Sequence, residues 1–160
     1  MSIAIDQTRL RRIVGRVAPG LTLTRDEGET ILQIAQLAAG ADEENHPQEH
    51  AVLQQVAQHI GSAMGVDVGE LHMIPKIPDE EARAGRLERL AIRLDARRTK
   101  DLAYTFAFLV SIADLELVPA ETKALEEFQL ALGVSDRRAM DLVVMLSEII
   151  EGGHAPRPHA

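Results

Sequence analysis

The chain has 160 residues, no cysteine, only four aromatic residues (three Phe and one Tyr) and a formal net charge of −8 at pH 7. This length fits one domain with its own core, and the negative charge disfavours non-specific binding to nucleic acid or to an anionic membrane. The lack of cysteine excludes disulfides, thiolate metal sites and cysteine nucleophiles, and it fits a reducing compartment.

The sequence predicts neither a membrane span nor a secretory signal. No apolar run approaches the roughly 18 residues that a membrane span needs. The first residues, 1–6, lack a basic start followed by an apolar segment, so they do not resemble a signal peptide. We therefore expect a cytoplasmic protein that does not insert into membranes.

Three helices are predicted in the first half, because apolar residues recur there at helical spacing. They cover about residues 6–17, 24–39 and 47–64, and a short turn or helix follows at about 68–73. Thr24 and Glu27 form a capping-box pattern at the start of the second helix. Pro47 fits the first position of the third helix, and Gly65 stops that helix. The segment between Pro75 and Pro78 is the expected boundary between the halves.

Four more helices are predicted in the second half, and no segment has a convincing strand pattern. They cover about residues 79–96, 100–113, 119–132 and 135–150, and residues 152–160 are expected to form a disordered tail. Thr99 is the expected cap of the second of these helices, and Ser135 is the expected cap of the last. The helix over 100–113 is apolar on nearly all sides, which predicts a central, buried position.

A motif in the first half returns in the second half at a fixed offset of 72 residues. It consists of Asp42, Pro47 and Glu49 in the first copy, and residues 114, 119 and 121 carry the same residue types in the second. The offset falls to 68 at Gly65 and Gly133, so the first copy has four extra residues, around 61–64. This pattern predicts a duplicated helical unit, with repeats over about 6–74 and 79–151 in one domain, 1–151.

Each copy places an Asp where one helix ends and a Glu at the third position of the next helix. The pairs are Asp42 with Glu49 and Asp114 with Glu121. An Asp at a helix C-terminus is disfavoured by the helix dipole, and a bound cation would compensate for it. Oxygen ligands without cysteine favour Ca²⁺ or Mg²⁺ over Zn²⁺. The alternative is that the acids only cap helices and stabilise turns.

At these residues the chain resembles the tellurite-resistance protein B (TerB-like) family. The resemblance rests on residues 111–114, 119–121 with Leu125, and 133–135, and on residues 39–42, 47–49 and 53 in the first copy. It implies an all-α, pseudo-symmetric bundle of about seven helices and an acidic cluster for a divalent cation, here Asp42, Glu49, Asp114 and Glu121. Family members occur in stress-response operons and in DnaJ-like co-chaperones. One departure concerns the loops, because Glu43 and Leu115 stand where the family often has Gly.

Three functions remain open, and no catalytic residue is predicted. The first is a non-enzymatic stress-response module that binds a divalent cation or a protein partner through its acidic loops. The second is a metal-free interaction or dimerisation scaffold, and the third is a metal-dependent hydrolase that uses the same acids. His46 and His50 with a loop carboxylate are a further, less favoured zinc set. An arginine row between 83 and 97 is expected to be a solvated face or an anionic-partner site, not a nucleic-acid site.

Overall fold

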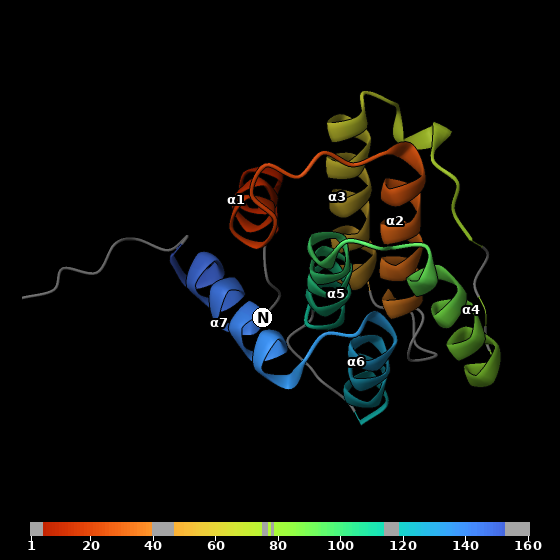
Figure 1. Cartoon of the computed structure of the whole chain (residues 1–160). Helices are drawn as coiled ribbons and strands as arrows, with labels where there is room; N and C mark the ends of the chain where they lie inside the picture. Colours follow the sequence, from red (N-terminus) through yellow and green to blue (C-terminus); the bar gives the residue numbers. More distant parts are fainter. Residues whose placement is uncertain (1–4, 40–46, 75–76, 78, 114–118, 153–160) are drawn as a thin grey trace, which may run out of the picture.

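The fold is all-α, as the helical periodicity predicts. The computed structural model describes residues 5–39, 47–74, 77, 79–113 and 119–152, with the backbone alone at 119–122, 124, 151 and 152. Within these ranges there is no strand. The elements, shown in Figure 1, are α1 (Gln7–Val17), α2 (Arg25–Ala39), α3 (Pro47–Met64), the 3-10 helix η1 (Val68–Glu70), α4 (Glu80–Ile92), α5 (Arg97–Ser111), α6 (Pro119–Leu132) and α7 (Asp136–Gly152). The tail predicted for 152–160 lies outside the described residues, except Gly152, which ends α7.

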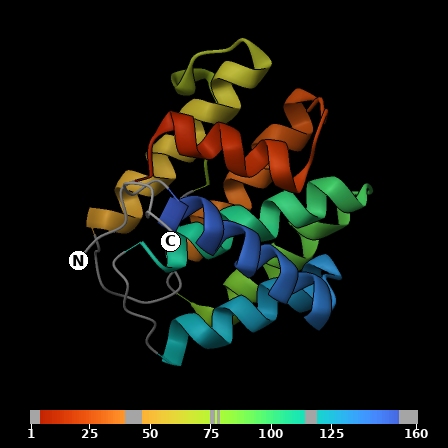
Figure 2. The same ribbon diagram turned by 90° about the vertical axis from the view of Figure 1, so that its left-hand side faces the viewer.

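Helices α2 and α5 pack against each other through the middle of the bundle, and the other helices surround this pair (Figures 1 and 2). The central position predicted for α5 is confirmed, since Phe106, Ala107 and Leu109 are almost fully buried. Buried hydroxyl groups on α5 are satisfied within the helix. Thr105 donates to the Asp101 carbonyl at 2.7 Å, and Ser111 donates to the Ala107 carbonyl at 2.9 Å. This bonding lets polar side chains sit in the core without losing hydrogen bonds.

Several helix starts follow local capping rules. The Thr24 hydroxyl accepts from the Glu27 amide at 3.1 Å, and the Glu27 carboxylate accepts from the Thr24 amide at 3.0 Å, which completes the predicted capping box. The Ser135 hydroxyl accepts from the Arg138 amide at 3.1 Å, as predicted for the start of α7. These contacts involve residues three apart, so the sequence alone carries the signal.

The junction between α4 and α5 differs from the prediction. Helix α4 ends at Ile92, not near residue 96. The amides of Arg93 and Leu94 bond to carbonyls three residues back, as in a 3-10 turn, and Leu94 is buried at 1 % exposure. Helix α5 then starts at Arg97, and the predicted cap at Thr99 is wrong. Its hydroxyl donates to the Ala96 carbonyl at 2.7 Å inside the first turn, so it caps no amide. At this junction the burial of Leu94 and Thr99 outweighs the helical periodicity up to residue 96 and the capping preference of Thr99.

Helices α3 and α6 end in the same way. Gly65 and Gly133 have φ angles of 70° and 66°, a left-handed conformation that only glycine adopts without strain. In both helices this glycine amide donates to the carbonyl three residues back, and the following valine amide donates to the carbonyl five residues back. This is the Schellman pattern. Helix α3 has 18 residues and α6 has 14, which agrees with the four extra residues of the first copy.

The helix contacts also follow a repeated scheme. The packing of α1 on α3 and of α2 on α3 corresponds to that of α4 on α6 and of α5 on α6. The cross-contacts correspond as well, since α1 touches α5 as α4 touches α2, and α3 touches α5 as α6 touches α2. Helix α7 departs from this scheme because it packs on α1, whereas η1 makes no equivalent contact with α4. Superposition of the two halves stays a prediction.

Polar side chains of α2 hold a connector, residues 70–74, between the halves. Arg25 donates to the Glu70 carbonyl at 2.6 Å, and Gln33 donates to the His72 carbonyl at 3.0 Å. Gln36 donates to the Ile74 carbonyl and accepts from the Ile74 amide, each at 3.0 Å. The Glu29 carboxylate accepts from the His72 amide at 2.6 Å, and this bond lowers the pKa of Glu29 below its usual value.

Candidate functional site

The helix ends that flank the two predicted acidic loops lie on one side of the bundle. Figure 1 shows α2 ending and α3 beginning at the same end of the molecule, and Figure 2 shows the start of α3, the end of α5 and the start of α6 on its left-hand side. The predicted ligands Asp42 and Asp114 lie outside the described residues. The described helices therefore position only the two glutamates of the predicted set.

Both glutamates occupy the third position of their helix, as predicted. Pro47 and Pro119 begin α3 and α6, so Glu49 and Glu121 each fall in a first turn. The first turn favours a carboxylate, because the free amides and the helix dipole carry positive potential there. The side chain of Glu121 lies outside the described part. Glu49 is only 2 % exposed, which is unusual for a glutamate.

The predicted metal set stays a prediction. Within the described ranges, no three histidine, aspartate or glutamate residues come together in a way that would hold a metal ion. This finding covers Glu49 but neither of the two aspartates. The four predicted ligands are carboxylates without sulfur, and such a set would suit a hard cation such as Ca²⁺ or Mg²⁺.

The histidines in the described residues serve different structural roles. His50 is exposed on α3. His72 Nδ1 lies 3.0 Å from the Glu29 carboxylate in the connector. His59 is half-buried on α3, with its ring edge-on to Phe106 at a centroid distance of 6.5 Å. Burial, followed by the nearby Arg11 charge, lowers the pKa of His59 below 6.5. His46 of the zinc alternative lies outside the described residues.

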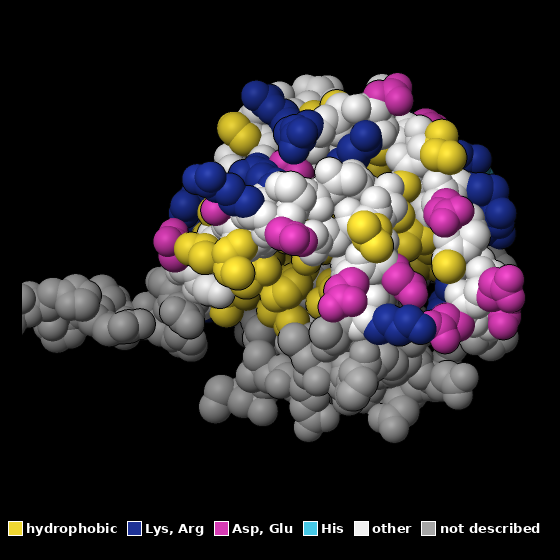
Figure 3. Space-filling model, turned by 60° about the horizontal axis from the view of Figure 1, so that its bottom comes forward, with side chains coloured by type: hydrophobic (Ala, Val, Ile, Leu, Met, Phe, Trp, Pro, Cys, Tyr) yellow, Lys and Arg dark blue, Asp and Glu magenta, His cyan; other side chains and the backbone are white. Residues whose placement is uncertain are grey.

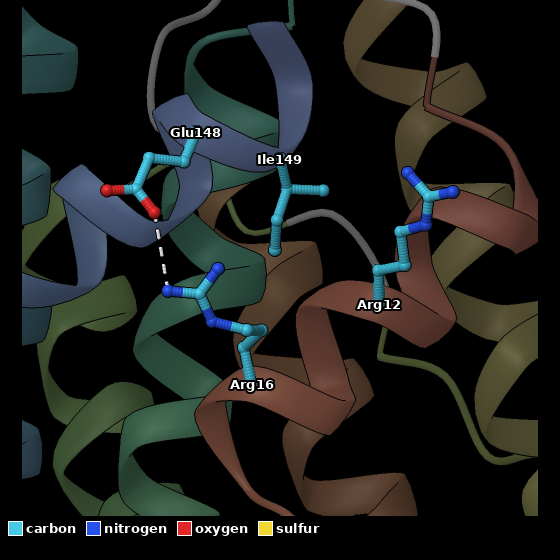
Figure 4. A pocket seen from close by; sticks show the side chains of 4 residues that line it. All are labelled: Arg12, Arg16, Glu148 and Ile149. Carbon is cyan, nitrogen blue, oxygen red and sulfur yellow. Dashed lines mark hydrogen bonds and ion pairs between the residues drawn. The ribbon is translucent and has the colours of Figure 1, made fainter. Parts of the chain in front are cut away.

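A second candidate site is a groove between α1 and α7, with a volume of about 410 Å³. It is lined by Arg12 and Arg16 from α1 and by Glu148 and Ile149 from α7. Figure 4 shows Ile149 between the two arginines, with Arg16 turned toward Glu148 and Arg12 turned away from it. Arg16 and Glu148 form an ion pair at 3.3 Å. The sequence gives no local signal for this groove, because the groove joins residues more than 130 positions apart.

A smaller hollow of about 170 Å³ lies where α5 begins and α6 ends. It is lined by two acidic side chains (Asp95 and Asp101), two basic side chains (Arg97 and Lys100) and residues 132–134. Asp101 is buried and accepts from Arg138 Nε at 2.9 Å, so this carboxylate ties α5 to α7. The balanced charges and the engaged Asp101 give the hollow a structural role.

The described residues form an all-α bundle with an arginine-lined groove between α1 and α7, and none of its described helices has the length and apolar character needed to cross a membrane. Comparison of this chain with protein-family models, with curated proteins and with solved structures finds no match. The resemblance to the TerB-like family therefore stays a prediction from the motif residues alone.

Proposed function

We propose that this protein is a non-enzymatic helical module, similar to TerB-like proteins, that binds a divalent cation through Asp42, Glu49, Asp114 and Glu121. The observation that supports this proposal is the position of Glu49, which is 2 % exposed in the first turn of α3. A carboxylate loses much of its hydration when it is buried, so the fold keeps one there only where positive charge or hydrogen bonds surround it.

The arrangement of the helix ends supports the same proposal. The start of α3 and the start of α6 lie on one side of the molecule, and each carries its glutamate at the same helical position. A cation at this side would interact favourably with Glu49 and would offset the repulsion between several carboxylates. Because all four candidate ligands supply oxygen, we favour Ca²⁺ or Mg²⁺ over Zn²⁺.

Calorimetric titration with CaCl₂, MgCl₂ and ZnCl₂ tests the proposal, together with thermal unfolding with and without each metal. We expect binding heat and a raised melting temperature in the wild type, but neither in the Asp42→Ala/Asp114→Ala variant. At about 100 times the Kd, a bound ion stabilises the fold by about 2.7 kcal/mol. The control is Glu88→Ala/Asp141→Ala, which removes two exposed acids elsewhere and leaves binding intact. A wild type without heat or thermal shift would refute the cation proposal.

The second candidate function is a helical interaction scaffold without a metal. The exposed apolar side chains of Met140 and Val144 on α7, at 65 % and 50 % exposure, favour it. In this case the loop acids act only as caps and turn residues. The Asp42→Ala/Asp114→Ala variant would then lose about 1 kcal/mol of stability, and added metal would change neither protein.

A further inference from the structure

Helix α1 is strongly basic although the whole chain is acidic. Between Gln7 and Val17 it carries four arginines and no acidic residue, whereas the chain has a net charge of −8. Its apolar side, with Leu10, Ile13 and Val17, is buried in the core. Arg12 and Arg16 are exposed and four positions apart, so they project from the same side of the helix.

Helix α7 carries exposed apolar residues on the face that also bears Glu148, the ion-pair partner of Arg16. Met140, Val144 and Glu148 are four residues apart, so they share one face over about 12 Å of helix. Met140 and Val144 are 65 % and 50 % exposed. Figure 3 shows hydrophobic side chains gathered at the left of the molecule, with Lys or Arg side chains next to them, in the part occupied by α1 and α7. Basic and apolar side chains thus adjoin on one surface.

The groove between the two helices joins these features. Ile149 lies between Arg12 and Arg16 in Figure 4, so the groove has an apolar residue with a guanidinium group on either side. Arg16 is paired with Glu148, but both side chains are about half exposed, at 50 % and 59 %, and such pairs exchange readily for another partner. Among the described residues, Arg12 has no ion pair.

We propose that Arg12, Arg16, Met140, Val144 and Ile149, together called the α1–α7 face, bind an acidic amphipathic segment of another protein. The carboxylates of the segment pair with the two guanidinium groups, which present several donors to one carboxylate. Apolar residues of the segment cover Met140 and Val144, and the flexible methionine side chain adapts to their shape. None of these five residues belongs to the predicted set of cation ligands.

A second copy of this chain fits the α1–α7 face less well. A closed dimer brings the same patch of both copies together, so the arginines of one copy and the arginines of the other would lie on facing surfaces. Glu148 would offset part of this repulsion, but each pair it formed with the second copy would replace its present pair with Arg16. Nucleic acid also fits less well, because phosphates leave the exposed apolar residues of α7 uncovered and the net charge of −8 repels them.

Fluorescence anisotropy with the full chain tests this proposal. The probe is a labelled helical peptide with leucine on one face and glutamate elsewhere, and the control probe has lysine in place of glutamate. We expect the glutamate peptide alone to bind, and more weakly at high salt. Arg12→Ala/Arg16→Ala and Met140→Ser/Val144→Ser should each weaken binding by about tenfold or more.

Two matched variants control for general loss of charge or apolar surface. Arg89→Ala/Arg93→Ala removes two exposed arginines, also four positions apart, at the end of α4. Ile92→Ser/Leu130→Ser removes two exposed apolar side chains, at 77 % and 81 % exposure, from other helices. Both controls should bind the glutamate peptide like the wild type.

Several results would overturn the proposal. One is that the glutamate peptide does not bind, and another is that the control variants lose as much affinity for it as the test variants do. A third is that single-stranded DNA binds more tightly than the peptide at the same salt concentration. Light scattering after size-exclusion chromatography measures the oligomeric state and gives one further test. A dimer that Met140→Ser/Val144→Ser dissociates would show that a second copy occupies the face.

Discussion

Gly61 lies in α3 where the chain turns back over the end of the helix. The Val66 amide donates to the Gly61 carbonyl at 2.9 Å. A Cβ atom at Gly61 would lie 2.8 Å from the Val66 carbonyl oxygen and 3.7 Å from Val68. The closest of these atoms belongs to the backbone, so a rotamer change cannot relieve the overlap. We therefore predict that Gly61→Ala destabilises the protein.

Two opposing contributions set the magnitude of this effect. Alanine is more favourable than glycine inside a helix by about 1 kcal/mol. Inserting a methyl group into a filled site costs about 1–3 kcal/mol, and contact with backbone places this case at the upper end. We expect a net loss of about 1–2 kcal/mol, which lowers the melting temperature of a chain of this size by about 2–8 °C.

The matched control is Gly15→Ala in α1, where a Cβ atom meets nothing within 4 Å. This substitution gains helix propensity without an overlap, so it should stabilise the protein by about 0.5–1 kcal/mol. Urea unfolding followed by circular dichroism measures both variants. If Gly61→Ala is as stable as the wild type, or if both variants change stability in the same direction, the packing argument at Val66 is incorrect.

Two further predictions concern ionisable groups that are buried or half-buried. Arg138→Met should lower the stability of the fold by about 2–3 kcal/mol, because it leaves the Asp101 carboxylate, at 3 % exposure, without its partner. The double variant Asp101→Asn/Arg138→Met should lose less stability, and equal losses in a double-mutant cycle would contradict this prediction. For His59, the folded pKa is lowered below 6.5, so the unfolded state binds the proton first and stability should fall as the pH drops through this value. His59→Gln should flatten this dependence in urea unfolding, and an unchanged slope would exclude His59 as its source.

The sequence predicts the helices best where the signal is local. Thr24 with Glu27, Ser135 with the following turn, and the glycines that end α3 and α6 all act within a few residues. The end of α4 depends instead on the burial of Leu94 in the core, which competes with local helix propensity. Hydrophobic periodicity alone therefore predicted an end of α4 that lies beyond the observed one.

The candidate sites differ in the same respect. The third-position placement of Glu49 follows from Pro47 and the repeat, whereas its near-complete burial depends on packing across helices. The groove of Arg12 and Ile149 requires α1 and α7 to meet across almost the whole chain. The four arginines of α1 were the available signal in the sequence, but nothing local places α7 beside them.

The connector between the halves has a consequence for how copies of this protein assemble. Arg25, Glu29, Gln33 and Gln36 bind the backbone at residues 70, 72 and 74, so these bonds do not depend on the side chains of the connector. Domain swapping needs a hinge that opens, and opening residues 70–74 as that hinge would first break these five hydrogen bonds. Exchange of halves through an opening of residues 70–74 is thereby discouraged, whereas the side chains of this connector remain open to evolutionary change.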